Sequence, residues 1–238
     1  MTDALSLAKS ELPSYLTPED VNSDAGRLDN EEGMTGTPRL LLTQSNSPQF
    51  AKQNAAVGDY YSTVHCSSFG DEIDVVPVCW QREWVEFFGD DDEEVGVKTR
   101  KLTRNEAIAE WGSEEFWRYE ALHLHCLAPI GGSVTPQPVA FTFKGWGSKP
   151  GNEMYNTSIH GIQAPIQAQL WTLGCESKPG KKGSEVKAPT VRFKGHATED
   201  HFKAAVEFCK LLADKDLSVD FNEEPGSAKV KGDEDMPF

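Results

Sequence analysis

The stretch EIDVVPVCWQREWVEFF, residues Glu72–Phe88, decides the fold class, because β-branched and aromatic side chains dominate it over a long run. Its large side chains recur at every second position, which is typical of a β-strand with one buried face. Pro77 predicts a sheet edge or a bulge, since proline cannot donate to a strand ladder. One face of this strand is predicted to carry Val76, Val78, Trp80, Arg82 and Trp84.

Shorter strand-like runs lie on both sides of this stretch. They cover residues 59–66, 122–126, 139–144, 170–175 and 190–196. The Phe and Val content of these runs and their alternation with polar residues favour half-buried strands.

Two helices are predicted from their capping signals. Thr103 and Glu106 form a capping box, and Gly112 is expected to end that helix. Thr198 is expected to cap a second helix, in which apolar residues recur at helical spacing over positions 202–213.

The remaining segments of the body are predicted to be loops. They are acidic at 89–94, rich in glycine at 145–151 and basic at 177–188. The predicted fold is mainly β with one or two helices (α+β), arranged as an OB-like small barrel with a C-terminal packing helix.

The charge of the 238-residue chain, −15 in total, is concentrated at its ends. Residues 1–36 carry eight acidic and two basic side chains, and residues 214–238 carry eight and three. Both segments are predicted to be disordered and acidic. Residues 37–213 are predicted to form one domain, in which positions 141–196 carry eight basic and three acidic side chains. Such a locally basic surface can bind phosphates.

Several classes of protein lack support in the sequence. No apolar run reaches the roughly 18 residues of a membrane span, and no secretory signal is visible. Nucleotide-binding and nucleophile-elbow motifs are absent from the sequence, so no cofactor and no enzymatic activity is expected. Five cysteines without framework spacing favour reduced thiols and a cytoplasmic location: Cys66, Cys79, Cys126, Cys175 and Cys209.

The last six residues, Asp233-Glu234-Asp235-Met236-Pro237-Phe238, resemble the acidic tip of bacterial single-stranded-DNA-binding proteins. In that family the tip recruits replication and repair enzymes. A terminal Phe presents a ring and a carboxylate together, and the preceding acidic residues attract a basic rim. The resemblance implies that Asp233–Phe238 bind partner proteins.

The body resembles a family of tailed-phage proteins found among DNA-metabolism genes and sometimes labelled as single-stranded-DNA-binding. Residues 38–49, 58–61 and 70–87 carry this second resemblance. It implies sequence-independent binding of single-stranded DNA during phage DNA replication or recombination, in the cytoplasm of the infected host. A homo-oligomer is compatible with the sequence.

Strand binding requires aromatic rings that stack on bases and cations that hold phosphates. Trp80 and Trp84, and likewise Phe141 and Phe143, also suit a core. The candidate strand-binding residues are Arg82, Trp84, Lys144, Trp146, Lys149, Lys178, Lys181, Lys182, Lys187, Arg192 and Lys194.

Two other functions remain open from the sequence. The first is an interaction protein that mimics the host tail without binding DNA. The second is a metal-dependent nuclease or recombination accessory, for which the acidic residues near 71–74 and 90–94 are candidate ligands. His123 and His125, with Cys126 on the opposite strand face, form a weaker metal motif that lacks an identifiable third ligand.

Overall fold

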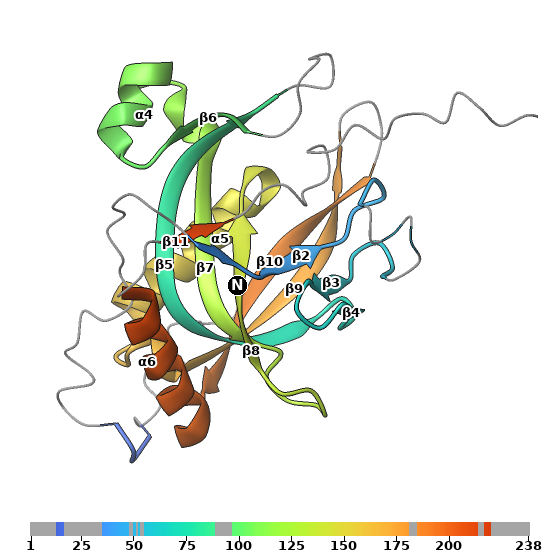
Figure 1. The fold of residues 1–238 in the computed structure, drawn as a ribbon, viewed down its shortest axis with the longest axis vertical. Coiled ribbons are helices and arrows are strands. Elements are labelled where there is room, and N and C mark those ends of the chain that lie inside the picture. Colours follow the sequence, from blue (N-terminus) through green and yellow to red (C-terminus); the bar gives the residue numbers. More distant parts are fainter. Residues whose placement is uncertain are drawn as a thin grey trace, which may run out of the picture.

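The computed structural model describes residues 13–16, 35–47, 50, 52, 55–88, 97–180, 185–213 and 217–219. Its central element is strand β5 (Ile73–Phe87), which lies within the stretch that the sequence marks as the longest strand. In Figure 1, β5 is a strongly curved arch that connects the upper and lower parts of the molecule.

Nine strands form one sheet around β5. The others are β2 (Arg39–Leu42), β3 (Tyr60–Ser62), β4 (Ser67–Ser68), β6 (Val97–Lys101), β7 (Glu120–Ala128), β8 (Gln137–Phe143), β9 (Gln169–Pro179) and β10 (Glu185–His196). The order is β10-β9-β5-β7-β8-β2-β3-β4, and β6 also pairs with β5. Neighbours are antiparallel except β2 and β8, which are parallel.

The sheet is open, so the predicted OB-like barrel is wrong, while the mixed α+β class is confirmed. Strands β10 and β4 end the pairing order. A side chain spans the gap between β10 and the loop after β2. Gln44 Nε2 donates to the carbonyl of Lys187 at 2.8 Å, and the Lys187 amide donates to Gln44 Oε1 at 2.9 Å. Two side-chain hydrogen bonds thus join β10 to the loop after β2, where the described strands have no backbone ladder.

A bulge in β5 divides the predicted common face of that strand. The register against β7 shifts between Pro77 and Cys79, which confirms the bulge predicted at Pro77. Trp80 packs in the main core, whereas Val76 and Val78 pack in a second cluster with Cys79. The extra residue moves the later side chains to the opposite face.

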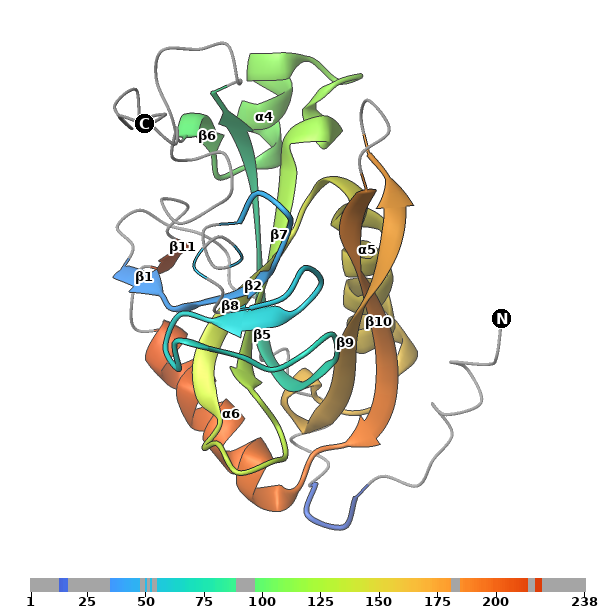
Figure 2. The same cartoon turned by 90° about the vertical axis from the view of Figure 1, so that its right-hand side faces the viewer.

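Both predicted helices are present. In α4 (Arg104–Trp111), Thr103 and Glu106 form the capping box. In α6 (Glu199–Ala213), Thr198 Oγ1 accepts a hydrogen bond from the His201 amide at 3.3 Å. Helix α6 covers the second cluster at the lower end of β5, as Figures 1 and 2 show, which confirms a C-terminal packing helix. None of the helices in the described ranges has the length and apolarity needed to cross a bilayer.

A third helix, α5 (Ser148–Asn156), begins within the glycine-rich segment 145–151 that was predicted to be a loop. A Cβ on Gly151 would lie 2.5 Å from Phe143 Cβ, so only glycine lets α5 approach β8 this closely. The basic segment 177–188 is also not entirely a loop, because β9 and β10 extend into it from both ends. Short helical turns complete the described elements: η1 (Phe116–Tyr119), η2 (Gly145–Gly147), η3 (Thr157–Gly161) and η4 (Ile166–Ala168).

The main core lies between two parts of the curved sheet. Figure 2 shows β9 and β10 on one side and β7 and β8 on the other. Large rings fill the space, and the Phe141 and Phe143 rings meet edge to face at 4.8 Å. Trp80 and Trp171 are also buried there. The alternative that Phe141 and Phe143 belong to the core is therefore confirmed.

Parts of both predicted tails contact the body. The Tyr15 hydroxyl donates to the carbonyl of Ala197 at 2.5 Å, and its ring packs against Phe202. Strand β11 (Leu217–Val219) pairs in parallel with β1 (Thr35–Thr37), which leads directly into β2. Residues 13–16, 35–36 and 217–219 of the two segments predicted to be disordered are thus in contact with other described residues, and the rest of both segments lies outside the described residues.

Candidate nucleic-acid interface

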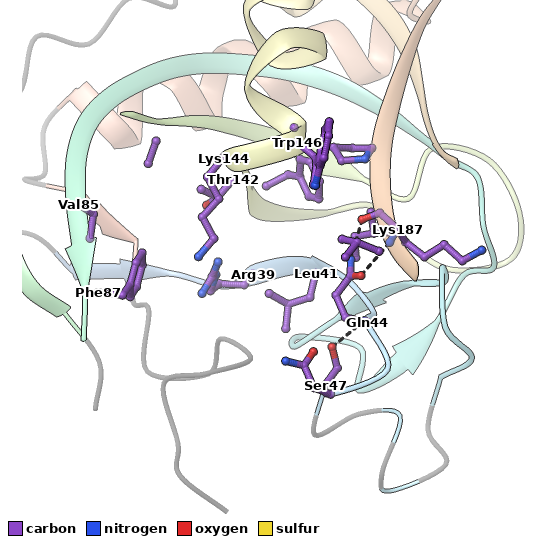
Figure 3. Close-up of a pocket in the computed structure, with 18 of the residues that line it drawn as sticks. Arg39, Leu41, Gln44, Ser47, Val85, Phe87, Thr142, Lys144, Trp146 and Lys187 are labelled. Atoms are coloured by element: carbon purple, nitrogen blue, oxygen red, sulfur yellow. Dashed lines mark hydrogen bonds between the residues drawn. The ribbon is translucent and has the colours of Figure 1, made fainter. Parts of the chain in front are cut away.

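A groove of about 650 Å³ lies where β2, β8 and β10 approach each other. Figure 3 shows its floor and rim. Four of its lining side chains are basic and two are acidic. They are Arg39, Arg118, Lys144 and Lys187, against Glu120 and Glu185. Aromatic side chains of Phe87, Tyr119, Phe141 and Trp146 also line it. The groove thus combines the two kinds of side chain that strand binding requires.

Trp146 lies at the rim with 55% of its surface exposed, as a stacking residue requires. Gly145 before it has φ +53°, which glycine adopts without strain, and the turn η2 follows. A Cβ on Gly147 would lie 3.0 Å from Pro189 of β10, so the turn packs closely against that strand. The turn therefore holds the Trp146 ring outward at the edge of the groove.

Arg39 and Lys144 form the basic floor of the groove. Arg39 is only 4% exposed, and its place in β2 is opposite Ala140 of β8. Lys144 follows β8 directly, and its Nζ lies 4.1 Å from the centroid of the Phe87 ring. Figure 3 shows the charged ends of Arg39 and Lys144 directed toward each other. Burial, reinforced by the positive charge of Arg39, lowers the pKa of Lys144 to about 7.

A buried polar chain runs from the groove into the sheet. Thr142, which lines the groove, has its Oγ1 at 2.9 Å from His123 Nδ1. His123 Nε2 lies 2.7 Å from Glu83 Oε1, and Arg100 contacts Glu83 Oε2 at 2.5 Å. Burial raises the pKa of Glu83, but His123 and Arg100 together outweigh that effect and lower it. Because the ionised carboxylate only accepts, His123 Nε2–H donates to it, and in the neutral ring Nδ1 accepts the Thr142 O–H.

Enzymes that use a hydroxyl as nucleophile align a hydroxyl, an imidazole and a carboxylate in the same order. Here His123 and Glu83 have no exposed surface, and Glu83 is also held by Arg100. Glu83 belongs to β5, His123 to β7 and Thr142 to β8, so the chain of hydrogen bonds joins three adjacent strands. We therefore assign this chain of bonds a structural role.

His123 and His125, which the sequence offered as weak metal ligands, lie within hydrogen-bond distance of neighbouring side chains. His125 Nε2 lies 3.1 Å from Gln81 Oε1, and burial, reinforced by His123, lowers the pKa of His125 to about 3. His125 therefore stays neutral. Within the described part of the chain, no three His, Cys, Asp or Glu side chains gather as a metal site.

Among the predicted strand-binding residues, Lys144 and Trp146 lie together in the groove. Trp84 is 5% exposed, so its assignment to the binding surface is wrong and its alternative core assignment holds. Arg82 does not line the groove, and it contacts Glu120, which does, at 3.0 Å and Asn152 at 3.0 Å. Lys149 is exposed on α5 but does not line the groove.

The basic residues of β9 and β10 do not gather in one place. Lys187 lines the groove and pairs with Glu185 at 2.8 Å, and Lys178 pairs with Glu176 at 2.9 Å. Arg192 and Lys194 line a separate hollow of about 370 Å³. Lys181 and Lys182, the acidic run 90–94 and the tip Asp233–Phe238 lie outside the described residues.

The hollow near Arg192 also holds two of the proposed metal ligands. Lys194 Nζ lies 2.5 Å from Asp74, and Arg192 lies 3.8 Å from Glu72. Asp74 additionally accepts a hydrogen bond from Thr172 at 2.7 Å. These acidic side chains are engaged with cations and a hydroxyl, which weakens the nuclease alternative.

Sequence reasoning missed Arg39, Phe87 and Arg118 in the groove. Arg39 stands in a short apolar strand, Arg39–Leu42, that looks like ordinary core. Phe87 ends a strand whose other face fills the core. One signal was available: the run Phe116-Trp117-Arg118-Tyr119 combines aromatic and basic residues, and Trp117 is 58% exposed.

Comparisons with known proteins identify one family. Neither the curated proteins nor the solved structures contain a match to this chain. Residues 7–125, half of the chain, match the model of the Pam3 phage gp34-like protein family, and the chain therefore belongs to that family.

Proposed function

We propose that this phage protein binds single-stranded DNA, without sequence specificity, in the groove between β2, β8 and β10. One observation carries the proposal: the exposed ring of Trp146 stands at the rim of a concave surface whose floor holds Arg39 and Lys144. A ring of this kind stacks on any base, and cations beside it hold the backbone without reading sequence.

The shape and charge of the groove support this ligand over duplex DNA. The groove is lined by strands and by the helical turn η2, and two of its four basic side chains, Arg39 and Lys144, form its floor. A flexible single strand can enter such a concavity, whereas a stiff duplex presents its phosphates on a broad convex surface. DNA replication or recombination in the infected host is the process in which such a protein acts.

The acidic tip Asp233–Phe238 is proposed to recruit phage or host replication and recombination proteins. The position of β11, the last described element before the tip, is compatible with a tip that reaches either a partner protein or the groove. Pairing of β11 with β1 puts Val219 opposite Thr37, two residues before Arg39. The segment that leads to the tip therefore begins close to the strand that supplies the groove floor.

The test is a titration of labelled oligo-dT with the full chain at several salt concentrations, with duplex DNA of equal length as the control. We expect tighter binding of oligo-dT and an affinity that falls as salt rises, because phosphate contacts release counterions. Absence of oligo-dT binding at low salt, with the protein folded, would refute the proposal. Capture of host tail-binding proteins in that case would favour the host-mimicking interaction protein instead.

A further inference from the structure

Aromatic rings stand toward both ends of the groove. Figure 3 shows Phe87 at one end and Trp146 and Lys187 toward the other, with Arg39 between them. The proposed stacking on Trp146 accounts for only one of these ends. The groove is therefore longer than a single stacked base needs.

A second ring that could stack on a base lies at the Phe87 end. Tyr119 is the last residue of η1 and lines the groove, and its neighbour Glu120 is opposite Trp84 of β5. Strand β5 ends three residues after Trp84, at Phe87. Tyr119 therefore belongs to the same end of the groove as Phe87.

The Tyr119 ring is supported by a second ring. The Trp111 ring stacks on it with the centroids 4.4 Å apart and the planes 22° from parallel. Trp111 is in turn held by its Nε1–H, which donates to Glu86 Oε2 at 3.3 Å. Trp111 does not line the groove, so the part of the Tyr119 ring that borders the groove is not the face that Trp111 covers. A ring fixed in this way loses little conformational freedom when a base stacks on it.

A basic side chain accompanies each of the two rings. Lys187 lines the groove at the Trp146 end, and Arg118 lines it next to Tyr119. The contact of Arg118 with Glu115, at 3.2 Å, is an exposed ion pair. Such a pair contributes little to stability, so the guanidinium can turn to a phosphate at small cost. Both ends thus combine the ring and the cation that strand binding requires.

We infer that the bound strand crosses the groove lengthwise and stacks one base on Trp146 and a second base on Tyr119. This inference rests on the proposed function, because it assigns both stacking positions to the same groove. It implies a minimum length of strand for tight binding. A shorter strand occupies one ring, and a longer strand occupies both.

The experiment measures affinity against strand length. Oligo-dT of about 2 to 16 nucleotides covers the usual site sizes of single-strand-binding domains. Competition fluorescence anisotropy gives the affinity of each oligonucleotide for full-length wild type, Tyr119→Leu and Tyr119→Phe. Trp117→Ala is the matched control, because Trp117 belongs to the same turn but does not line the groove. Thermal unfolding of each variant verifies the fold.

Tyr119→Leu should bind the shortest oligonucleotides as wild type does and the longer ones about 5- to 150-fold more weakly, which is the effect of one lost stack. Tyr119→Phe keeps the ring, so it should bind every length as wild type does, and so should Trp117→Ala. An equal loss for Tyr119→Leu at every length would assign Tyr119 a structural role. That result, or no loss at any length, overturns the inference while leaving strand binding intact.

A second measurement needs no variant. Oligo-dT that carries 5-iodouracil in place of thymine is crosslinked to the full chain by ultraviolet light, and mass spectrometry identifies the modified residues. Long oligonucleotides should crosslink to both Trp146 and Tyr119. Crosslinks at Trp146 without any at Tyr119 overturn the inference. If wild type binds oligo-dT at none of the lengths, the proposed function is wrong, and the inference with it.

Discussion

The polar chain of Glu83, His123 and Thr142 and the floor of the groove are two polar regions of the same sheet, and their charges are arranged in opposite ways. In the polar chain, the Glu83 carboxylate lies between the Arg100 guanidinium and the His123 imidazole, so the opposite charges of Glu83 and Arg100 meet. On the floor, Arg39 and Lys144 bring like charges together.

This contrast distinguishes a structural region from a binding region. Opposite charges with full hydrogen bonding hold strands in register, and their loss is costly because it leaves a buried charge. A basic floor in an open groove is suited to an anionic ligand rather than to holding strands in register. Substitutions in the polar chain should therefore change mainly stability, and substitutions on the floor should change mainly affinity for the ligand.

The largest effect is expected for Glu83→Leu. It leaves Arg100 and His123 without their shared carboxylate, and removal of one partner of a buried pair costs about 3–5 kcal/mol. Glu110→Gln breaks a surface pair with Lys101 and should cost no more than about 1 kcal/mol. Urea unfolding measures both values. If Glu83→Leu is no less stable than Glu110→Gln, the polar chain is not a structural element.

Lys144→Met should change stability in the other direction. Methionine removes a half-buried ammonium whose pKa is lowered in the folded protein, so the free energy of unfolding should rise, by on the order of 1–3 kcal/mol at pH 6. The unfolded chain binds a proton at Lys144 that the folded protein lacks between pH 7 and 10.5. Wild-type stability from this group therefore rises with pH in that window, and the advantage of methionine shrinks.

The same Lys144→Met variant should bind oligo-dT more weakly than wild type. Opposite changes in stability and affinity are the expected signature of a charge kept for its ligand. Thermal unfolding at pH 6, 8 and 10 and a binding titration measure the two quantities. A destabilised variant, or one with unchanged affinity, would place Lys144 among ordinary structural residues.

Trp146→Ala should weaken oligo-dT binding by about 1–3 kcal/mol and leave the unfolding temperature almost unchanged, because the ring is exposed and stacks on a base. Trp117→Ala is the matched control, since that ring is 58% exposed but does not line the groove. Equal losses in the two variants would assign the effect to exposed aromatic surface in general rather than to the groove.

The smallest effect on DNA affinity is expected at the acidic tip. Deletion of Asp233–Phe238 should leave the fold intact and the affinity equal or slightly higher, most clearly at low salt where charge interactions are least screened. Deletion of Phe238 alone should hardly change affinity but should abolish recovery of host tail-binding proteins in a pull-down. Equal recovery with and without Phe238 would show that the likeness of this tip to bacterial tails has no function.

Local patterns predicted a substantial part of the fold. Alternating side chains located β5, and the capping residues Thr103 and Thr198 located the starts of α4 and α6. Pro77 indicated the bulge. These signals succeed because capping, alternation and the missing proline amide act between residues close in sequence.

The candidate site was predicted only in part for the same reason. Trp146 follows a glycine and has another after it, so its exposure is a local property. Trp84 and Arg39 have no such local signal. Whether Trp84 is buried and whether Arg39 reaches a groove depend on which strands lie beside β5 and β8.

By itself, the sequence determined the positions of β5, α4 and α6 and the concentration of acidic charge at the chain ends, since each depends on neighbouring residues or composition. Only the tertiary structure decided that the sheet stays open, that Gln44 bridges its gap, and that Arg39 meets Lys144. Those contacts join segments from about 100 to more than 140 residues apart, and such pairings are set by packing of the whole core rather than by local preference.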